Sequence, residues 1–481
     1  MAERFRAPSR ALHIALTAIM AAALMLGAVV FPYGEWMAEH FAPLAVGIMA
    51  FGAVIPFCKN YRRMLAIGML CLPLTQAPTL KALIRWRVSE VVGWIFLLKH
   101  LKEGGATRLP REARVFVMAL ALYFLYTGTV GAMLAGVTET PVEKVLEYYV
   151  SPFFRSLLET ARGAAALGMV LELLRASKGF DDLRKWAALL ALGGGVSGGY
   201  ALYQSFVGFY GLPLPLLPGT LSHPWSLRPF GTFYEPTGTG SFLAAAMFLD
   251  LYLLTSGGRR GLWAGCLAVS AMGFFASLSR AGWLGLAAGA VVLAVCTLAG
   301  RGALRAGTVA RRGAPWKGMA VAIIAVCALA LGGWAASGMM GSANVNFALS
   351  WDWLRQSAAS RISAYAGIPS GMLDCWGVGF GQGLLIFREG GAPGFVRLIL
   401  EGGIVGMCLL AILHACAVRS LGALLSHPEH EARRYAAFLA AAYASCAVTT
   451  CNYINTTDMW IWVVWALPVI SMTAIAENLR H

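Results

Sequence analysis

The sequence predicts an all-α polytopic membrane protein, and three observations carry that prediction. Of the 481 residues, 58% are hydrophobic and 13% are charged, with a mean hydropathy of +0.67. Soluble domains are about 45–50% apolar and about 25% charged, so an ordinary soluble enzyme is excluded. A spanning helix needs about 20 apolar residues, and the roughly 279 apolar residues of the chain allow about fourteen spans. Clusters of Arg and Lys also bound most of the long apolar runs.

About fourteen apolar runs are expected to cross the membrane. The third and fourth are the weakest, because Pro73 and Pro78 interrupt one while Arg85 and Arg87 crowd the other. A re-entrant pair at this position would lower the count to about twelve. The first run is too long for a cleavable signal peptide and lacks a cleavage-type ending, so we expect a signal anchor. The expected spans are 12–32, 41–58, 64–77, 86–101, 115–136, 156–174, 186–207, 240–256, 262–279, 281–300, 318–338, 396–417, 435–451 and 459–476.

Basic residues gather on one side of these spans. If both chain ends share a side, that side holds about 26 of the 38 Lys and Arg but only about 10 Asp and Glu. The opposite side holds about 12 basic and about 13 acidic residues. Cytoplasmic loops carry the excess of Lys and Arg in membrane proteins, so both termini are predicted to be cytoplasmic. The net charge of +15 therefore indicates topology, and nucleic acid is not expected as a partner.

The chain is expected to form a single transmembrane domain over residues 1–481. Its two sizeable outer loops are 208–239 and 339–395. All of the 10 cysteines except Cys375 fall in or beside spans, so no disulfide framework is expected in the outer loops. The sequence has no CxxC spacing, and a buried apolar thiol is the preferred interpretation for nearly all of them.

Two arginines stand out on the predicted outer side. Arg228 lies with Glu235 in a stretch, 221–240, where Gly and Pro are too dense for a helix. Its guanidinium either reaches the lipid head groups or grips a phosphate through two hydrogen bonds. Arg280 lies between two spans that are too close together for a real loop, and a charge held in that position is expected to be functional.

The long outer loop carries a helix and a glycine-rich run. We expect the helix over about 350–366, with Gly367 and Pro369 as stop signals, and it would place Arg361 and Tyr365 on one face. The run 377–383 is either a phosphate cradle or a set of turns, and the strand–loop–helix context of a cradle is missing. Arg388, Glu389 and Arg397 follow, and Glu401 enters the next span, where a carboxylate is costly unless it is paired or used.

The outer face thus combines several arginines with few carboxylates. No Asp-x-Asp and no outward His cluster occurs, so neither a metal nor another cofactor is expected. Arginines alone can neutralise the charge of a leaving diphosphate, which favours a lipid diphosphate delivered in the plane of the membrane. Aromatic residues either stack on sugars or form a membrane-interface belt. The arginines are Arg228, Arg280, Arg355, Arg361, Arg388 and Arg397, and the aromatics are Trp351, Trp353, Tyr365 and Trp376.

Four pieces of the sequence, in order over about 220–415, resemble the O-antigen polymerase/ligase superfamily of bacterial inner-membrane glycosyltransferases. The pieces are Arg228-x-x-Gly-Thr-Phe-x-Glu235-Pro, Ser279-Arg280 opening a span, Arg361 before Gly377-Val-Gly-x-Gly, and Leu400-Glu401-x-Gly-Ile-Val-Gly. The resemblance implies a helical, GT-C-like fold with a periplasmic active site. It also implies inverting glycan transfer from undecaprenyl diphosphate without metal or nucleotide sugar.

Within that family the polymerase branch is favoured. Ligases carry a His before the Gly-x-x-Gly of the last piece, and the corresponding positions here are Ala392 and Pro393. The resemblance implies that Arg228, Arg280 and Arg361 neutralise the diphosphate and that Glu235 or Glu401 acts as the general base. Arg355, Arg388, Arg397, Tyr365 and Trp351 would contact the substrate. Membrane lipid and a chain-length regulator are the other expected partners.

Three alternatives stay open from the sequence. The first is a ligase that moves a finished glycan onto lipid A core or a protein. The second is a transporter of lipid-linked sugars, which would need charged residues along several spans. The midspans are predicted to be nearly charge-free, with Arg162, Glu172 and Asp250 toward helix ends. The third is a structural scaffold, which explains none of the arginine placement.

Overall fold

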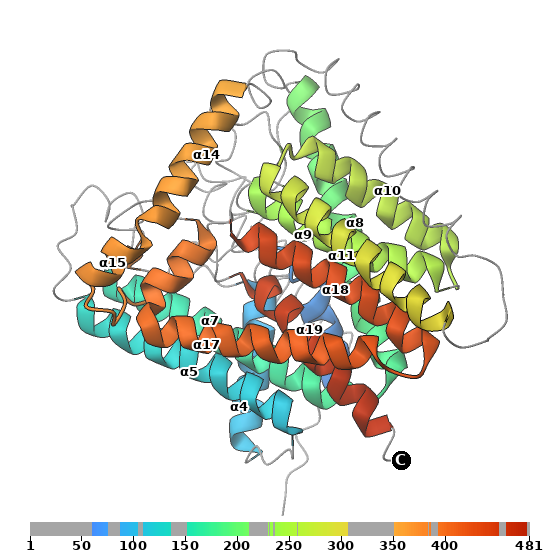
Figure 1. Ribbon diagram of the computed structural model, residues 1–481, viewed down its shortest axis with the longest axis horizontal. Helices are drawn as coiled ribbons and strands as arrows, with labels where there is room; N and C mark the ends of the chain where they lie inside the picture. Colours follow the sequence, from blue (N-terminus) through green and yellow to red (C-terminus); the bar gives the residue numbers. More distant parts are fainter. Residues whose placement is uncertain are drawn as a thin grey trace, which may run out of the picture.

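The computed structural model describes the chain over residues 60–75, 87–103, 109–135, 152–210, 229, 231–233, 236–256, 258–305, 351–382, 384–385, 393–451 and 458–478. These residues form helices joined by turns, with no strand among them, so the predicted all-α class is confirmed for this part of the chain (Figure 1). Three expected spans, 12–32, 41–58 and 318–338, lie outside the described residues.

The described helices follow the expected spans closely. Each of the other eleven spans has a helix, and the helix expected over about 350–366 is present as α14, followed at once by α15. The helices are α3 (Tyr61–Leu70), α4 (Val88–Lys102), α5 (Arg111–Leu134), α7 (Pro152–Ala176), α8 (Phe180–Tyr210), α9 (Pro236–Thr255), α10 (Arg260–Ala276), α11 (Arg280–Arg305), α14 (Trp351–Ala366), α15 (Ile368–Asp374), α17 (Gly394–Leu425), α18 (His430–Thr450) and α19 (Met459–Asn478).

Five of these helices are long and apolar enough to cross a membrane. They are α5, α9, α17 and the stretches Arg280–Leu298 of α11 and Met459–Ala476 of α19. This finding agrees with a membrane protein. The two weakest expected spans correspond to the short helices α3 and α4, of 10 and 15 residues. At 1.5 Å per residue, neither reaches the roughly 30 Å of a hydrocarbon core.

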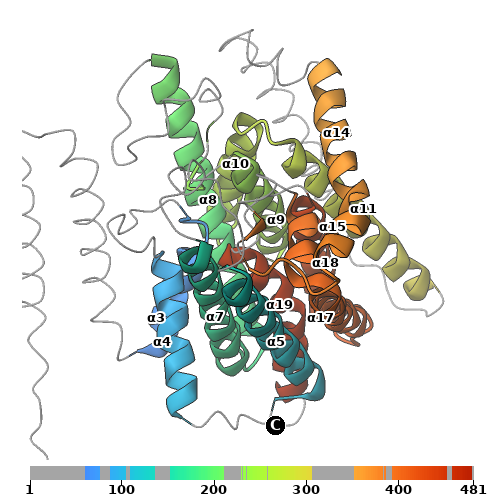
Figure 2. The same cartoon turned by 90° about the vertical axis from the view of Figure 1, so that its left-hand side faces the viewer.

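Two groups of helices meet at α19. In the first, α4, α5 and α7 lie side by side and α17 packs on α5 (Figure 2). In the second, α8, α10, α11 and α18 surround α9, whose hydrophobic window is 89% buried. Helix α19 contacts members of both groups and buries Trp460, Trp462 and Trp465 between them. These packed aromatic rings make α19 the core of the bundle.

Small residues allow the helices of the first group to approach closely. A Cβ atom added at Gly93 of α4 would lie 2.2 Å from the Ala165 carbonyl oxygen of α7. One added at Gly168 of α7 would lie 2.1 Å from the Gly93 carbonyl oxygen. Because lipid chains are as apolar as the side chains, such backbone-to-backbone packing is a main source of helix association in membranes.

The helix ends sort into two ends of the bundle. At one end Arg175 of α7 pairs with Glu103 after α4, and Arg434 of α18 donates to Ser256 Oγ after α9 at 2.6 Å. At the other end Thr75 donates to the Thr232 carbonyl oxygen, and Arg87 pairs with Asp458. The first end joins loops that the charge count assigns to the cytoplasm, and the second joins loops assigned to the outer side.

Candidate functional site

The predicted site residues divide into described and undescribed positions. Arg228, Glu235 and Arg388 lie outside the described residues, as does the side chain of Trp351, the first residue of α14. The described ones fall into two places. Arg280, Arg355, Arg361 and Tyr365 lie on α11 and α14, and Arg397 and Glu401 lie inside the bundle on α17.

Arg280 and Arg361 approach the carboxyl end of α18 from two directions. Arg280 opens α11, and a Cβ at Gly285, one and a half turns later, would lie 2.2 Å from Thr449 Cγ2 near the end of α18. Arg361 lies one turn before Tyr365 on α14, whose hydroxyl donates to the Cys451 carbonyl oxygen at 2.8 Å. Carbonyl groups at the end of a helix carry partial negative charge, which favours basic residues nearby. The structure thus brings these two predicted residues to one end of one helix.

Tyr365 is a neutral donor in this arrangement. Partial burial raises the pKa of its phenol, and the nearby Arg361 acts in the opposite direction. The hydroxyl therefore keeps its proton at neutral pH and its bond to the Cys451 carbonyl oxygen. Arg355, in the first half of α14, is exposed.

Arg397 and Glu401 pair with each other instead of facing outward. Arg397 Nε lies 2.8 Å from Glu401 Oε1, and their side chains are 3% and 0% exposed. A general base must reach its substrate within hydrogen-bond distance. Glu401, one of the two carboxylates predicted for that role, is buried and paired with Arg397, and the other, Glu235, lies outside the described residues.

The pair belongs to a larger set of charges that the sequence analysis missed. We call it the buried charge network; its members are Arg87, Glu90, Arg155, Glu159, Arg162, Arg397, Glu401 and Asp458. The carboxylates Glu90, Glu159, Glu401 and Asp458 are at most 1% exposed. The sequence analysis expected nearly charge-free midspans, and it did not foresee that these carboxylates are enclosed inside the helix bundle.

The connections within the buried charge network run from helix to helix. Arg162 of α7 bridges two carboxylates, with Nε 3.2 Å from Glu90 Oε1 and Nη1 3.3 Å from Glu159 Oε1. Arg155 Nη2 lies 2.5 Å from Glu159 Oε1, and Arg155 is within electrostatic reach of Arg397 and Glu401.

Four helix amino ends converge at this network. Its members lie within about the first three turns of α4, α7 and α17 and directly before α4 and α19. The positive ends of the helix dipoles favour Glu90 in the first turn of α4 and Asp458 before α19. The spacing of the members was visible in the sequence: Arg87 and Glu90 are three apart, and Arg397 and Glu401 four apart, as are Arg155 and Glu159. Charge pairs at helical spacing in an otherwise apolar segment indicate buried ion pairs, and that pattern could have revealed the network.

The described part of the glycine-rich run, residues 377–382, packs against α17 and α5. The amides of Phe380 and Gly381 donate to the carbonyl oxygens of Leu400 and Glu401 at 2.8 and 3.0 Å, and the Gln382 amide donates to Thr127 O at 2.8 Å. These N–H groups are used within the protein, so they cannot also cradle a phosphate. The turn interpretation of this run fits the structure.

A break in α17 makes that docking feasible. Gly403 has φ 58° and ψ −156°, which separates a short first segment, 394–402, from the rest of the helix. A Cβ at Gly403 would lie 2.4 Å from the Gly377 carbonyl oxygen. The Ile404 amide donates to that same oxygen at 2.9 Å. Only glycine fits this conformation and this contact.

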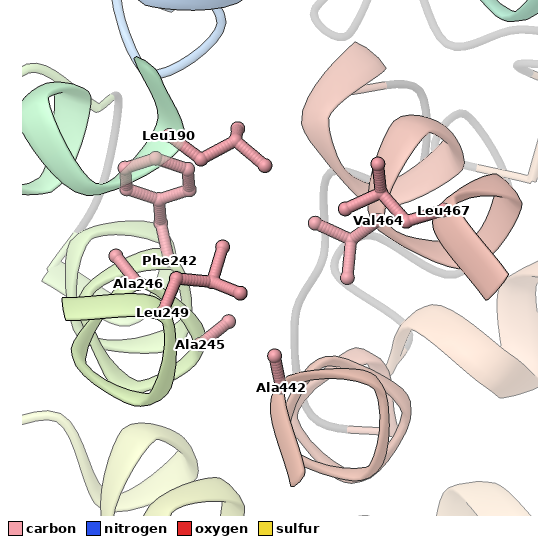
Figure 3. A pocket seen from close by; sticks show the side chains of 8 residues that line it. All are labelled: Leu190, Phe242, Ala245, Ala246, Leu249, Ala442, Val464 and Leu467. Atoms are coloured by element: carbon pink, nitrogen blue, oxygen red, sulfur yellow. The ribbon is translucent and has the colours of Figure 1, made fainter. Parts of the chain in front are cut away.

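Within the described ranges, no three His, Cys, Asp or Glu side chains converge as metal ligands. An apolar gap lies elsewhere, where α9 side chains face those of α19 (Figure 3). Its lining offers no group for a diphosphate, so we regard it as a packing gap; it consists of Leu190, Phe242, Ala245, Ala246, Leu249, Ala442, Val464 and Leu467.

Comparison with known proteins leaves the family undecided. No family model, curated protein or solved structure matches the chain.

Proposed function

We propose that the protein is a metal-independent inverting glycosyltransferase of the bacterial inner membrane. It would polymerise undecaprenyl-diphosphate-linked oligosaccharide repeat units at the periplasmic face, on a GT-C-like fold of about fourteen spans. The observation that carries the proposal is the approach of Arg280 and Arg361 to the carboxyl end of α18. Two always-charged guanidinium groups at one end of an apolar bundle suit an anion that arrives with a lipid tail.

In the proposed reaction, a hydroxyl of one lipid-linked unit attacks the anomeric carbon of another. The bond from that carbon to the diphosphate oxygen breaks, and the leaving diphosphate carries away the electron pair. Arg280 and Arg361, with Arg228, stabilise the charge that develops on the diphosphate. The hydroxyl proton passes to a general base, and Glu235 is assigned this role because Glu401 is held by Arg397.

A second candidate function is transport of a lipid-linked glycan. The buried charge network and the broken helix α17 favour it, since transporters place charged groups and interrupted helices inside the bundle. The network balances its own charges within the protein, however, and its carboxylates lie within about the first three turns of their helices or directly before α19. We therefore rank transport second.

Alanine variants of the two arginines test the proposal. In cells that depend on the plasmid-borne protein, Arg280→Ala and Arg361→Ala should each abolish chain extension while the protein level stays unchanged. Arg419→Ala is the matched control. Arg419 is exposed near the carboxyl end of α17, at the end of the bundle opposite to Arg280 and Arg361, and it should be dispensable for chain extension. Full-length glycan from either arginine variant would overturn the proposal.

A further inference from the structure

Among the residues that the structure describes, Asp250 has no charged partner, and it lies inside the second helix group. It lies on α9, about one and a half turns before the helix ends at Thr255, and it is 0% exposed. Neither of its carboxyl oxygens receives a hydrogen bond of regular geometry from a described residue. The Ser270 hydroxyl of α10 is close enough to interact with it. Asp250 differs in this respect from the carboxylates of the buried charge network, each of which has an arginine.

The basic side chains that reach this end of α9 contact Ser256, six residues after Asp250: Arg184 donates to its carbonyl oxygen and Arg434 to its hydroxyl, and the Arg434 guanidinium lies 5.8 Å from the Tyr252 ring. Between Lys185 and Tyr200, α8 carries no titratable residue, and on α10 only Cys266 follows Arg260. The basic residues of the helices packed on α9 are at the helix ends. The titratable groups of these helices are Asp181, Asp182, Arg184, Lys185, Tyr200, Tyr203 and Tyr210 on α8; Arg260 and Cys266 on α10; Arg280, Cys296, Arg301 and Arg305 on α11; His430, Glu431, Arg433, Arg434, Tyr435, Tyr443 and Cys446 on α18; Glu477 on α19; and Tyr252 on α9 itself.

An ionised carboxylate at this place would lack compensation. Moving a charge from water into an apolar interior is so costly that an unpaired group takes up a proton instead. The neutral acid can also donate a hydrogen bond to an acceptor such as the Ser270 hydroxyl oxygen, which a carboxylate cannot do.

We propose that Asp250 and Ser270 form a proton-binding site between α8, α9 and α10, in which the Asp250 carboxyl holds a proton at neutral pH. The site is separate from the arginines at the end of α18, and it does not rest on the proposed glycosyltransferase function. Its ligand is a proton, taken up from the end of the bundle where Tyr252 donates to Glu431 at 3.1 Å. A sodium ion would instead require Asp250 to be a carboxylate, and the experiment separates the two.

Infrared difference spectroscopy of the full-length protein tests the site directly. The spectrum of wild type minus Asp250→Asn at neutral pH should contain one carbonyl stretch of a protonated carboxyl, which shifts in heavy water. Glu103→Gln is the matched control: the hydrogen bond from Arg175 lowers the pKa of the exposed Glu103 carboxyl, so its difference spectrum should show loss of a carboxylate. Carboxylate bands in the Asp250→Asn difference spectrum would overturn the proposal.

A second measurement avoids the variant, in case Asp250→Asn does not fold. Wild-type protein with ¹³C in its aspartate carboxyl groups should show an isotope-shifted band of a protonated carboxyl at neutral pH. Asp458 is paired with Arg87, and Asp182 accepts from the Lys178 amide at an exposed site, so these two should contribute carboxylate bands. A labelled spectrum with carboxylate bands only would contradict the site.

Discussion

At the scale of single residues, the protein keeps its buried charges by pairing them. Glu90 and Glu159 are shielded from lipid and from water, and each lies within 3.3 Å of Arg162. Taking ions out of water costs several kcal/mol each, and close partners together with helix amino ends offset that cost. Removing one partner leaves a buried charge uncompensated, so these pairs should be far more sensitive to substitution than exposed ones.

Arg162→Met should therefore lower the free energy of unfolding by about 3 kcal/mol, which is at the low end of the cost of breaking a buried ion pair. The low end is expected because Arg87 and Arg155 still contact the two carboxylates in the variant. The measurement is reversible unfolding in mixed detergent micelles. Arg175→Met on the same helix is the control, since Arg175 and its partner Glu103 are 42% and 43% exposed. Exposed pairs add little stability. Equal effects of the two substitutions would contradict the account of the buried charge network.

At the scale of helices, α17 is two segments joined at a glycine. The first segment carries Arg397 and Glu401, and its last carbonyl groups accept hydrogen bonds from the run 377–383. The break and the docked run hold the buried pair in place, and they connect α17 to α5 through Thr127 and Gln382. The conformation of a single glycine thus positions a charged pair within the bundle.

Gly403→Ala should destabilise the protein by about 1–3 kcal/mol from backbone strain alone, and by more from the clash with the Gly377 carbonyl oxygen. Gly422→Ala, on the same helix, is the matched control. A Cβ at Gly422 would have no heavy atom within 4 Å, and replacing a helical glycine by alanine gains up to about 1 kcal/mol. A neutral Gly403→Ala in the same unfolding assay would show that the break is not required.

The helices could be predicted from the sequence much better than their contacts. Hydropathy and stop signals placed α14 to within a residue, because Gly367 ends it and Pro369 fits the first turn of α15. The buried charge network escaped because its pairs join residues far apart in the chain, such as Arg87 and Asp458. Within a single predicted span, each of these charged residues resembles a simple interruption of an apolar run. The docking of 377–383 on α17 is likewise a long-range contact that no local pattern encodes.

At the scale of the whole molecule, the helix ends separate into two ends of the bundle. One end holds the exposed pair of Arg175 and Glu103 and the largely buried pair of Lys99 and Glu172. The other gathers the helix amino ends of the buried charge network, together with α14 and α15. This division matches the alternation of loops expected from the charge count, which assigns the first end to the cytoplasm.

Cysteine labelling should confirm that orientation. In a cysteine-free background, Ser370→Cys on α15 should react with a membrane-impermeant maleimide added to spheroplasts, since Ser370 is exposed at the predicted outer end. Ser426→Cys, equally exposed in the turn between α17 and α18, should react only after the membrane is opened. The reverse pattern would contradict the predicted cytoplasmic termini.

The most direct test of the central claim is the size of the product. The purified full-length protein is reconstituted in vesicles with an undecaprenyl-diphosphate-linked repeat unit as the sole glycan substrate, and the lipid-linked products are separated by size. The account predicts a ladder of multiple repeats that remain on the lipid diphosphate. A repeat unit that crosses the membrane but stays at its original size, or that is transferred only once to a separate acceptor, would contradict it.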